Sequence, residues 1–309
     1  MDLPVNRTLA TEVILLGFSR NFRINLLLFF IFSVIYLVTI IGNGLMVCII
    51  VSSPHLHTPM YFFLCNLSLI DIFYSTRTVP KLLLDLLSSS RRISLLACGV
   101  QVYAGLFLGG TECLLLAVMA YDRYVAVCRP LYYLIVMRWN ICYQLIAFVW
   151  VGSFLTTVVP SLVMPMRVCN PNQLNHFVCE TLAVVKLSCD STRESEIVVV
   201  FLTFIVILFP FLFILLSYIV IISSVLMIQS ARRSKAFSTC SSHLTVVTLL
   251  YGTAMVMYFG PPSKYVSNKD KYVSVFNTVI IPMINPLIYS LKNKEVTKVF
   301  VMKKERFKL

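Results

Sequence analysis

Charged side chains are scarce in this sequence. They make up 13% of its 309 residues, whereas a soluble domain carries roughly a quarter. Residues of the hydrophobic set AVILMFWYC account for 59%, so the chain lacks the polar side chains to cover a water-facing surface. This excludes a disordered chain, a cytosolic enzyme and a soluble nucleic-acid-binding module, and it predicts an integral membrane protein.

Acidic residues are the scarcer of the two charged groups, at 13 against 26 Lys and Arg, which gives a net charge of +13. A soluble protein with this balance would be expected to bind nucleic acid. In a membrane protein we expect no nucleic-acid partner. We expect the excess positive charge to face anionic lipid headgroups or a cytoplasmic partner instead.

Patterns of catalytic chemistry are also missing. The sequence has no metal triad, no nucleophile with a paired base and no phosphate-binding loop, so an enzyme is not predicted. It also has no internal repeat of the kind found in many transporters. A transporter or ion channel therefore stays a secondary hypothesis.

Continuous apolar runs dominate the chain. A helix needs about 20 mainly apolar residues to cross ~30 Å of hydrocarbon, and seven segments satisfy this. The alternation typical of membrane β-barrels is absent from them. We predict an all-α membrane protein with an extracellular tail, 1–25, a seven-transmembrane helix bundle, 26–291, and a short basic cytoplasmic tail, 292–309. The predicted spans are 26–51, 61–87, 99–127, 141–163, 197–228, 236–259 and 272–291.

Two features orient the bundle, since Lys and Arg are divided almost equally between its two sides. Seven basic residues fall within 292–309, directly after the last span. A glycosylation sequon, Asn6-Arg7-Thr8, lies in the N-terminal tail, where only a lumenal location would allow its use. We therefore predict an extracellular N-terminus, glycosylated at Asn6, and a cytoplasmic C-terminus.

Four of the ten cysteines fall on the predicted outer side: Cys98, Cys169, Cys179 and Cys189. An even number in an oxidising compartment predicts two disulfides, and three pairings are open. Three of the four lie in the long loop after the fourth span, which disulfides would hold as a lid over the bundle. His176 and Cys179 are spaced as metal ligands, but two ligands do not make a site, so no metal is predicted there.

Two acids, Asp71 and Glu112, lie deep within predicted spans and at similar depth, counted at about 1.5 Å per residue from the cytoplasmic helix ends. Intramembrane carboxylates are costly and usually mark function, which favours a cation or proton site assisted by Asn43 and Asn285. A water-filled polar network that holds the helices in register explains the same residues. The sequence leaves both interpretations open.

The third predicted span carries two motifs. At its cytoplasmic end, Asp122-Arg123-Tyr124 is either an ordinary charged pair at a helix end or a conformational switch. A switch is possible because adjacent helical residues do not face each other well, so Arg123 can leave its neighbour and pair elsewhere. Nearer its outer end, Gly105 and Gly109 fit a close helix–helix contact or a small-residue wall that leaves room for a ligand. Both glycine interpretations hold if the glycines of this stripe face different neighbours.

Six sequence strings, in order and at the expected spacings, make the chain similar to the odorant receptors of the rhodopsin-like (class A) G-protein-coupled receptors over essentially its whole length. The chain departs from the family's pattern at Leu250, at Asn277 and in lacking a proline after Cys179. These differences concern the shape of the cavity rather than the fold. The strings are Gly42-Asn43, LHTPMYFFL at 56–64, MAYDRYVAVC at 119–128, SYIVII at 217–222, KAFSTCSSHL at 235–244 and PMINPLIYSLKNKEV at 282–296.

The resemblance implies one disulfide between Cys98 and Cys179, which leaves Cys169 and Cys189 as the second bridge. It also implies an activation mechanism, in which Arg123 is held at rest by its neighbouring aspartate. On activation the arginine turns toward two tyrosines and opens a cytoplasmic cleft for a G-protein α-subunit. The switch residues implied are Asp122, Arg123, Tyr124, Tyr218, Asn285, Pro286 and Tyr289.

A ligand cavity in the outer half of the bundle is implied as well. Its expected lining is mostly apolar with a few hydroxyls, which suits a small volatile ligand held by shape. No acid lies in the expected set, so an amine held by an ion pair is disfavoured. The set is Gly105, Leu106, Gly109, Gly110, Leu202, Val206, Tyr251, Ala254, Met255, Tyr258 and Thr278.

The function implied is that of an odorant receptor, multi-pass in the plasma membrane and surrounded by the lipid bilayer. It would bind a small volatile ligand and activate a heterotrimeric G protein of the olfactory stimulatory type, raising cyclic AMP. Asp71 matches the sodium-site acid of the class and Glu112 is expected to join it, so Na⁺ is the one ion expected and no other cofactor is. The alternative is a related receptor for a non-odorant small molecule outside the nose.

Overall fold

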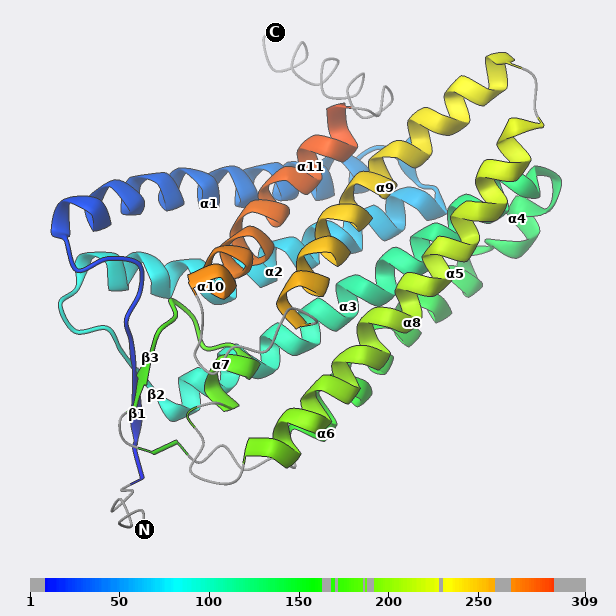
Figure 1. Cartoon of the computed structure of the whole chain (residues 1–309). Helices are drawn as coiled ribbons and strands as arrows, with labels where there is room; N and C mark the ends of the chain where they lie inside the picture. The colour runs from blue at the N-terminus through cyan, green and yellow to red at the C-terminus, as the bar shows by residue number, and fades with distance from the viewer. Residues whose placement is uncertain are drawn as a thin grey trace, which may run out of the picture.

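The computed structural model describes residues 9–162, 168–169, 172–185, 187, 192–227, 230–258 and 268–291. Over these residues the chain forms seven helical passes packed as a bundle, with a small sheet at one end (Figure 1). The predicted seven-helix fold is confirmed. The passes begin two to six residues before the predicted starts and end within two residues of the predicted ends.

Five passes are single helices and two contain a π-helical turn. The single helices are α1 (Phe22–Val51), α2 (Pro59–Leu87), α3 (Leu95–Cys128), α8 (Thr192–Leu226) and α9 (Ser230–Tyr258). The fourth pass is α5 (Trp139–Ser153), a π turn (Phe154–Val158) and α6 (Val159–Leu162); the seventh is α10 (Asn268–Val275), a π turn (Phe276–Ile280) and α11 (Ile281–Leu291). Shorter elements are α4 (Tyr133–Val136), α7 (Thr181–Val185), the 3-10 turns Pro54–Leu56 and Pro130–Tyr132, and the strands β1 (Glu12–Leu15), β2 (Arg92–Ser94) and β3 (Gln173–Leu174).

Local sequence signals explain where the first helices begin. The Asn21 side chain caps α1 by accepting a hydrogen bond from the Arg23 amide at 2.9 Å. Ser94 caps α3 by accepting from the Ala97 amide at 3.2 Å. Pro59 opens α2, where its missing N–H costs nothing and its fixed φ favours the helix.

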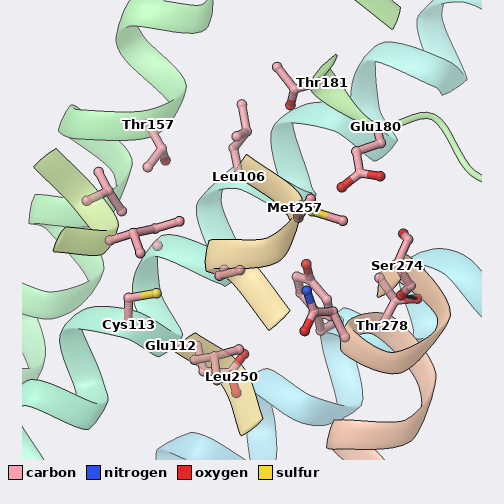
Figure 2. A pocket seen from close by; sticks show the side chains of 18 of the residues that line it. Leu106, Glu112, Cys113, Thr157, Glu180, Thr181, Leu250, Met257, Ser274 and Thr278 are labelled. Carbon is pink, nitrogen blue, oxygen red and sulfur yellow. Dashed lines mark hydrogen bonds between the residues drawn. The ribbon is translucent and has the colours of Figure 1, made fainter. Parts of the chain in front are cut away.

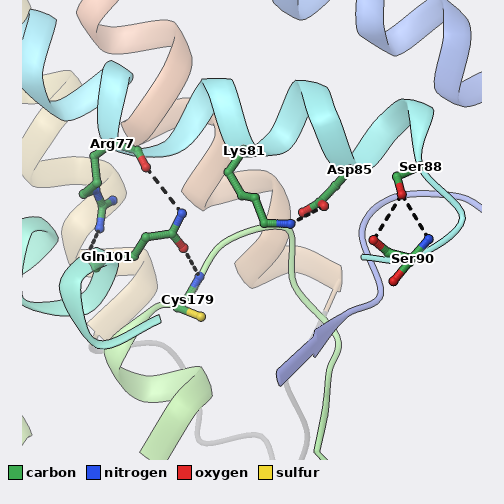
Figure 3. A network of polar contacts seen from close by, with 7 residues as sticks. All are labelled: Arg77, Lys81, Asp85, Ser88, Ser90, Gln101 and Cys179. Carbon is green, nitrogen blue, oxygen red and sulfur yellow. Dashed lines mark hydrogen bonds and ion pairs between the residues drawn. The ribbon is translucent and has the colours of Figure 1, made fainter. Parts of the chain in front are cut away.

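Six of the seven passes contain a segment long and apolar enough to cross a membrane, among the residues that the structure describes. The pass without such a segment is the second one in the chain, α2. It carries more charged residues and is packed between α1 and α3. One of its charges, Asp71, is 1% exposed inside the bundle. The Lys81–Asp85 pair forms an ion pair near the end of the helix that lies beside the sheet (Figure 3). The charged groups of α2 thus lie against the protein, so this pass spans with its neighbours despite its charges.

A three-stranded sheet closes one end of the bundle, in the order β2-β1-β3. β1, from the N-terminal tail, pairs antiparallel with β2 and parallel with β3. Val13 and Leu15 of β1 are buried against the loop between α6 and α8. The tail is therefore part of the cap over the bundle, which the sequence did not predict.

The sheet lies at the outer end of the bundle, because the disulfide between Cys98 and Cys179 is at the same end and disulfides persist in oxidising compartments. α11 ends at the opposite end (Figure 1). This arrangement agrees with the predicted orientation. Asn6 and the basic tail 292–309 lie outside the described residues.

Candidate functional site

The outer end of α3 is tied to the loop above it. Cys98 bonds to Cys179 across 81 residues of sequence, as the resemblance implied. Three residues further along α3, the Gln101 side chain donates to the Arg77 carbonyl at 3.3 Å and accepts from the Cys179 amide at 3.1 Å (Figure 3). Cys169 is also in a disulfide. Cys189 lies outside the described residues, so the second pairing stays a prediction.

An intramembrane arginine, Arg77 of α2, lies against this anchored part of α3. Its guanidinium donates to the Gln101 carbonyl and sits over the Tyr74 ring, 4.8 Å from the ring centroid. It also covers Gly105, where a Cβ atom would collide with Nη1. The charge is therefore held inside the protein and beside the cavity below the loop.

The cavity lies beneath the anchored loop and has a volume of ≈ 100 Å³. α3 forms one wall, α8 and α9 the others, and α10 with the following π turn completes it (Figure 2). Its middle is apolar and its polar groups come mainly from the loop, the fourth pass and the seventh pass. The lining residues are Tyr74, Gly105, Leu106, Gly109, Gly110, Glu112, Cys113, Thr156, Thr157, Glu180, Thr181, Leu202, Val206, Ile207, Leu250, Ala254, Met257, Ser274, Asn277 and Thr278.

Most of the predicted ligand residues line this cavity: Gly105, Leu106, Gly109, Gly110, Leu202, Val206, Ala254 and Thr278. Tyr251 does not, because its side chain is 1% exposed in the core and its hydroxyl donates to the Cys113 carbonyl at 3.1 Å. Met257, not Met255, faces the cavity from α9, since a shift of two residues turns the side chain to another face of a helix. The side chain of Tyr258 lies outside what the structure describes.

The expectation that no acid lines the cavity is wrong. Glu112 and Glu180 both line it (Figure 2). Glu112 follows Gly105 by two turns of α3, so the helical period returns it to the same face. Glu180 follows Cys179, whose disulfide carries the loop over the bundle. Its position next to that cysteine was the signal in the sequence that pointed to the roof.

Glu180 is mostly buried, with 20% of its side chain exposed, and accepts a hydrogen bond from Ser274. Burial raises the pKa of its carboxyl to about 7, opposed by the charge of Arg77 and by the Ser274 hydrogen bond and assisted by Asp270. His176 Nε2 lies 3.4 Å from its Oε2. Burial, with the charge of Lys271, lowers the pKa of His176 to about 4, so this imidazole is neutral at physiological pH.

Below the cavity the structure brings the two predicted intramembrane acids together. Asn285 donates to both carboxylate oxygens of Asp71 at 3.1 Å. Glu112 acts electrostatically on Asp71, and its Oε1 has no hydrogen-bond partner among the described residues. Asn43 donates to the Pro282 carbonyl at 2.9 Å and so joins α1 to α11 rather than to the acids.

The predicted switch lies at the cytoplasmic end of α3. Arg123 is 8% exposed, and its charge acts on Tyr218 and on Tyr289, the two tyrosines implied as its partners. Asp122 accepts a hydrogen bond at 2.8 Å from the hydroxyl of Tyr133, on α4. Two further predicted residues lie nearby: Tyr124 packs beside Tyr121, and Pro286 packs against Gly42.

A residue of this region that the sequence reasoning did not single out is His243 of α9. Its Nδ1 bonds to the Tyr218 hydroxyl at 2.8 Å and its Nε2 to the Leu116 carbonyl at 3.0 Å. One imidazole thereby links α9 to α8 and to α3. The signal for it was present in the string KAFSTCSSHL, of which this histidine is the ninth residue.

Comparisons with known proteins agree with this arrangement. A family model described as "Olfactory receptor" matches residues 32–304. Olfactory receptor 2A5 of Homo sapiens is 43% identical over 294 residues, which covers 94% of each chain. Olfactory receptor 2A7 of Mus musculus is 45% identical over 293 residues, again with 94% of each chain covered. The crystal structure of squid rhodopsin matches with a TM-score of 0.72 and 19% identity over 93% of this chain and 82% of that one, a likeness of fold.

Proposed function

The chain belongs to the olfactory receptor family of class A G-protein-coupled receptors, and from this membership we propose that it is an odorant receptor that couples ligand binding to a heterotrimeric G protein. Proteins of this family are multi-pass plasma-membrane receptors and not enzymes. The ligand we propose is small, volatile and mainly apolar, and the G protein is of the olfactory stimulatory type, which raises cyclic AMP.

The cavity under the anchored loop supports this most directly. Its volume of ≈ 100 Å³ is comparable to the engineered 150 Å³ protein cavity that holds benzene, so a compact molecule of few carbons fits it. Apolar groups such as Leu106, Val206 and Ile207 supply shape, while hydroxyl and carboxyl groups at the ends supply orientation.

One helix connects the cavity to the cytoplasmic end. Gly105 and Arg123 lie 18 residues apart on α3, a rise of about 27 Å. A ligand that binds one packing of α3, α8 and α9 more tightly than another shifts the bundle toward that packing. The His243 bridge and Arg123 sit where those same helices meet near the cytoplasm, so repacking there would open the site for the G-protein α-subunit.

We also propose that Asp71 and Glu112 form a site for Na⁺. Two buried carboxylates that act on each other electrostatically, with the Asn285 side chain bound to one of them, supply oxygen ligands of the kind that hard cations prefer. Replacing Na⁺ by choline at constant ionic strength should change agonist potency, and Asp71→Asn should remove that change. The same potency in both salts would contradict the site.

The main test is a cyclic-AMP reporter in cells that contain the olfactory-type stimulatory G protein. A chemically diverse odorant panel should contain compounds that raise cyclic AMP in a dose-dependent way. Arg123→Ala should abolish this rise while surface expression is unchanged. A normal dose response in Arg123→Ala would contradict the switch, and responses only to non-volatile metabolites would favour a receptor that acts outside the nose.

A further inference from the structure

The cavity has an acid at each end. Glu180 is in the roof, and Glu112 is in the floor, seven residues below Gly105 on α3, a rise of about 10.5 Å. Figure 2 shows the two carboxylates at opposite ends of the lining side chains, with Met257 between them. The apolar middle separates two groups that accept hydrogen bonds.

One oxygen of the floor acid lacks a hydrogen-bond partner among the described residues. Glu112 is 3% exposed, lines the cavity, and its Oε1 has no hydrogen bond among the described residues. A buried carboxyl oxygen without a donor is costly. A ligand group that donates a hydrogen bond would remove this cost, whereas a ligand group that only accepts would not.

The roof acid also keeps accepting capacity. Glu180 receives a hydrogen bond from Ser274, and a carboxylate has about four acceptor positions. Arg77, whose charge acts on Glu180, makes its hydrogen bond with the Gln101 carbonyl and lies over the Tyr74 ring. Among the described residues, no Lys or Arg nitrogen lies within 4.0 Å of the Glu180 carboxylate.

Two threonine hydroxyls of the wall donate their protons to backbone carbonyls of their own helices. Thr278 donates to the Ser274 carbonyl at 2.8 Å, and Thr156 donates to the Gly152 carbonyl at 2.7 Å, each within its own helix. Asn277 accepts from Thr253 through its side-chain oxygen. The protons of these two wall threonines are therefore committed within their helices, while their oxygens keep acceptor positions for a ligand.

From this distribution we infer that the cavity selects small ligands that donate hydrogen bonds, primary amines before alcohols, over aldehydes and carboxylic acids of the same carbon skeleton. Glu180 receives the ammonium group, and Glu112 accepts from neutral donors at the floor. A carboxylic acid is disfavoured because its charge would lie among two other carboxyls. This inference rests on the proposed function, since it takes the cavity to be the odorant site.

The test uses the purified full-length receptor and four probes with one skeleton: pentan-1-amine, pentan-1-ol, pentanal and pentanoic acid, at pH 7.5 and constant Na⁺. A ligand that binds only the folded state stabilises it by RT ln(1 + [L]/Kd), so the rise in melting temperature with ligand concentration gives a dissociation constant for each probe. We expect the amine to stabilise at the lowest concentration and the alcohol next. A ranking led by the aldehyde or the acid, or no shift with the amine, overturns the inference.

Three isosteric variants locate the amine. Glu180→Gln should raise the dissociation constant of the amine by about ten-fold or more, because a charge-assisted hydrogen bond is lost, and should change that of the alcohol little. Glu112→Gln should leave the preference for the amine over the alcohol in place. Glu12→Gln removes the same charge from a partly exposed side chain of β1, is the matched control and should change neither value. Loss of the amine preference in Glu112→Gln with its retention in Glu180→Gln would contradict the placement.

The cyclic-AMP reporter separates this inference from the proposed function. If the receptor signals through its G protein but prefers aldehydes, the ligand class is wrong and the receptor function stands. If the amine binds through Glu180 and no ligand that binds evokes G-protein signalling, the ligand class stands and the receptor function is wrong.

Discussion

The guanidinium of Arg77 occupies the space above Gly105 that a side chain at that position would need. An arginine within a membrane span is normally excluded, and here a backbone carbonyl, an aromatic face and a glycine together accommodate it. The neighbouring glycines face other partners: Gly109 lies near Tyr74, and Gly110 lies against Ser153 of the fourth pass. The three glycines of α3 therefore allow close contact with neighbouring side chains and also form part of the cavity wall.

Replacing Gly105 with alanine should destabilise the receptor. The added Cβ collides with Nη1 of Arg77, so we expect a loss of about 1–3 kcal/mol in unfolding free energy, measured as a lower melting temperature of the purified receptor. Gly109→Ala is the matched control, since its Cβ would lie 3.8 Å from the Tyr74 hydroxyl, an ordinary contact. Adding Arg77→Met to Gly105→Ala should recover part of the loss, and an unchanged melting temperature in Gly105→Ala alone would refute the collision.

Removing the disulfide over α3 should prevent delivery to the cell surface. A native disulfide that closes a long loop stabilises by about 2–4 kcal/mol, and this one holds the roof of the cavity. Cys98→Ser and Cys179→Ser should each reduce surface labelling to background. Cys48→Ser, at a free and exposed cysteine of α1, should be delivered normally. Normal delivery of either bridge variant would mean that the roof does not depend on this bond.

Replacing His243 should raise signalling without ligand. The imidazole joins α9 to α8 and α3, and each of its two hydrogen bonds contributes about 1 kcal/mol. His243→Phe keeps the ring and loses both bonds, so a larger fraction of receptors adopts a rearranged α9 and basal cyclic AMP rises at equal surface expression. Thr248→Val, which alters a hydroxyl bonded only within α9, is the control. Unchanged basal cyclic AMP in His243→Phe would show that the bridge does not restrain α9.

The parts of the structure that sequence predicted are those fixed by local chemistry or implied by the family resemblance. Helix positions follow from apolar runs, and the Cys98–Cys179 pairing follows from the family pattern. The β1 strand was missed because four residues of a mixed-polarity tail form a strand only when loop partners from distant sequence meet them. Side-chain direction within α9 was missed at Tyr251, because its hydroxyl finds a backbone carbonyl in the core rather than the cavity.

The two acids of the cavity, Glu112 and Glu180, also show that the sequence does not place side chains whose position depends on tertiary structure. Residue type alone marked Glu112 as an intramembrane acid, but its contribution to the cavity depends on which face of α3 is left uncovered. Glu180 reaches the roof only because the bridge at Cys179 folds the loop inward. The cavity lining implied by the resemblance therefore omitted both acids that line the cavity.

Amine binding should depend on pH through Glu180. Burial raises the pKa of its carboxyl to about 7 from an ordinary value of 4.5. The groups that face it are Arg77 and Tyr74 from α2, His176 from its own loop and Asp270 with Ser274 from α10. His176, with a pKa of about 4, stays neutral between pH 6 and 8. Within this window Glu180 is thus the group of the set whose charge we expect to change.

The direction of the pH dependence follows from which protonation states of the amine and of Glu180 bind each other. A primary amine stays protonated over this range, since its pKa is near that of lysine, about 10.4. The ammonium needs the ionised carboxylate, so amine affinity should rise as pH increases from 6 through 7 and level off near 8, by about five- to ten-fold overall. Pentan-1-ol, which needs no charge, should show a flat profile in the same thermal-shift measurement. Glu180→Gln should make the amine profile flat as well. An amine affinity that falls with rising pH, or a pH dependence that survives in Glu180→Gln, would place the titrating group elsewhere.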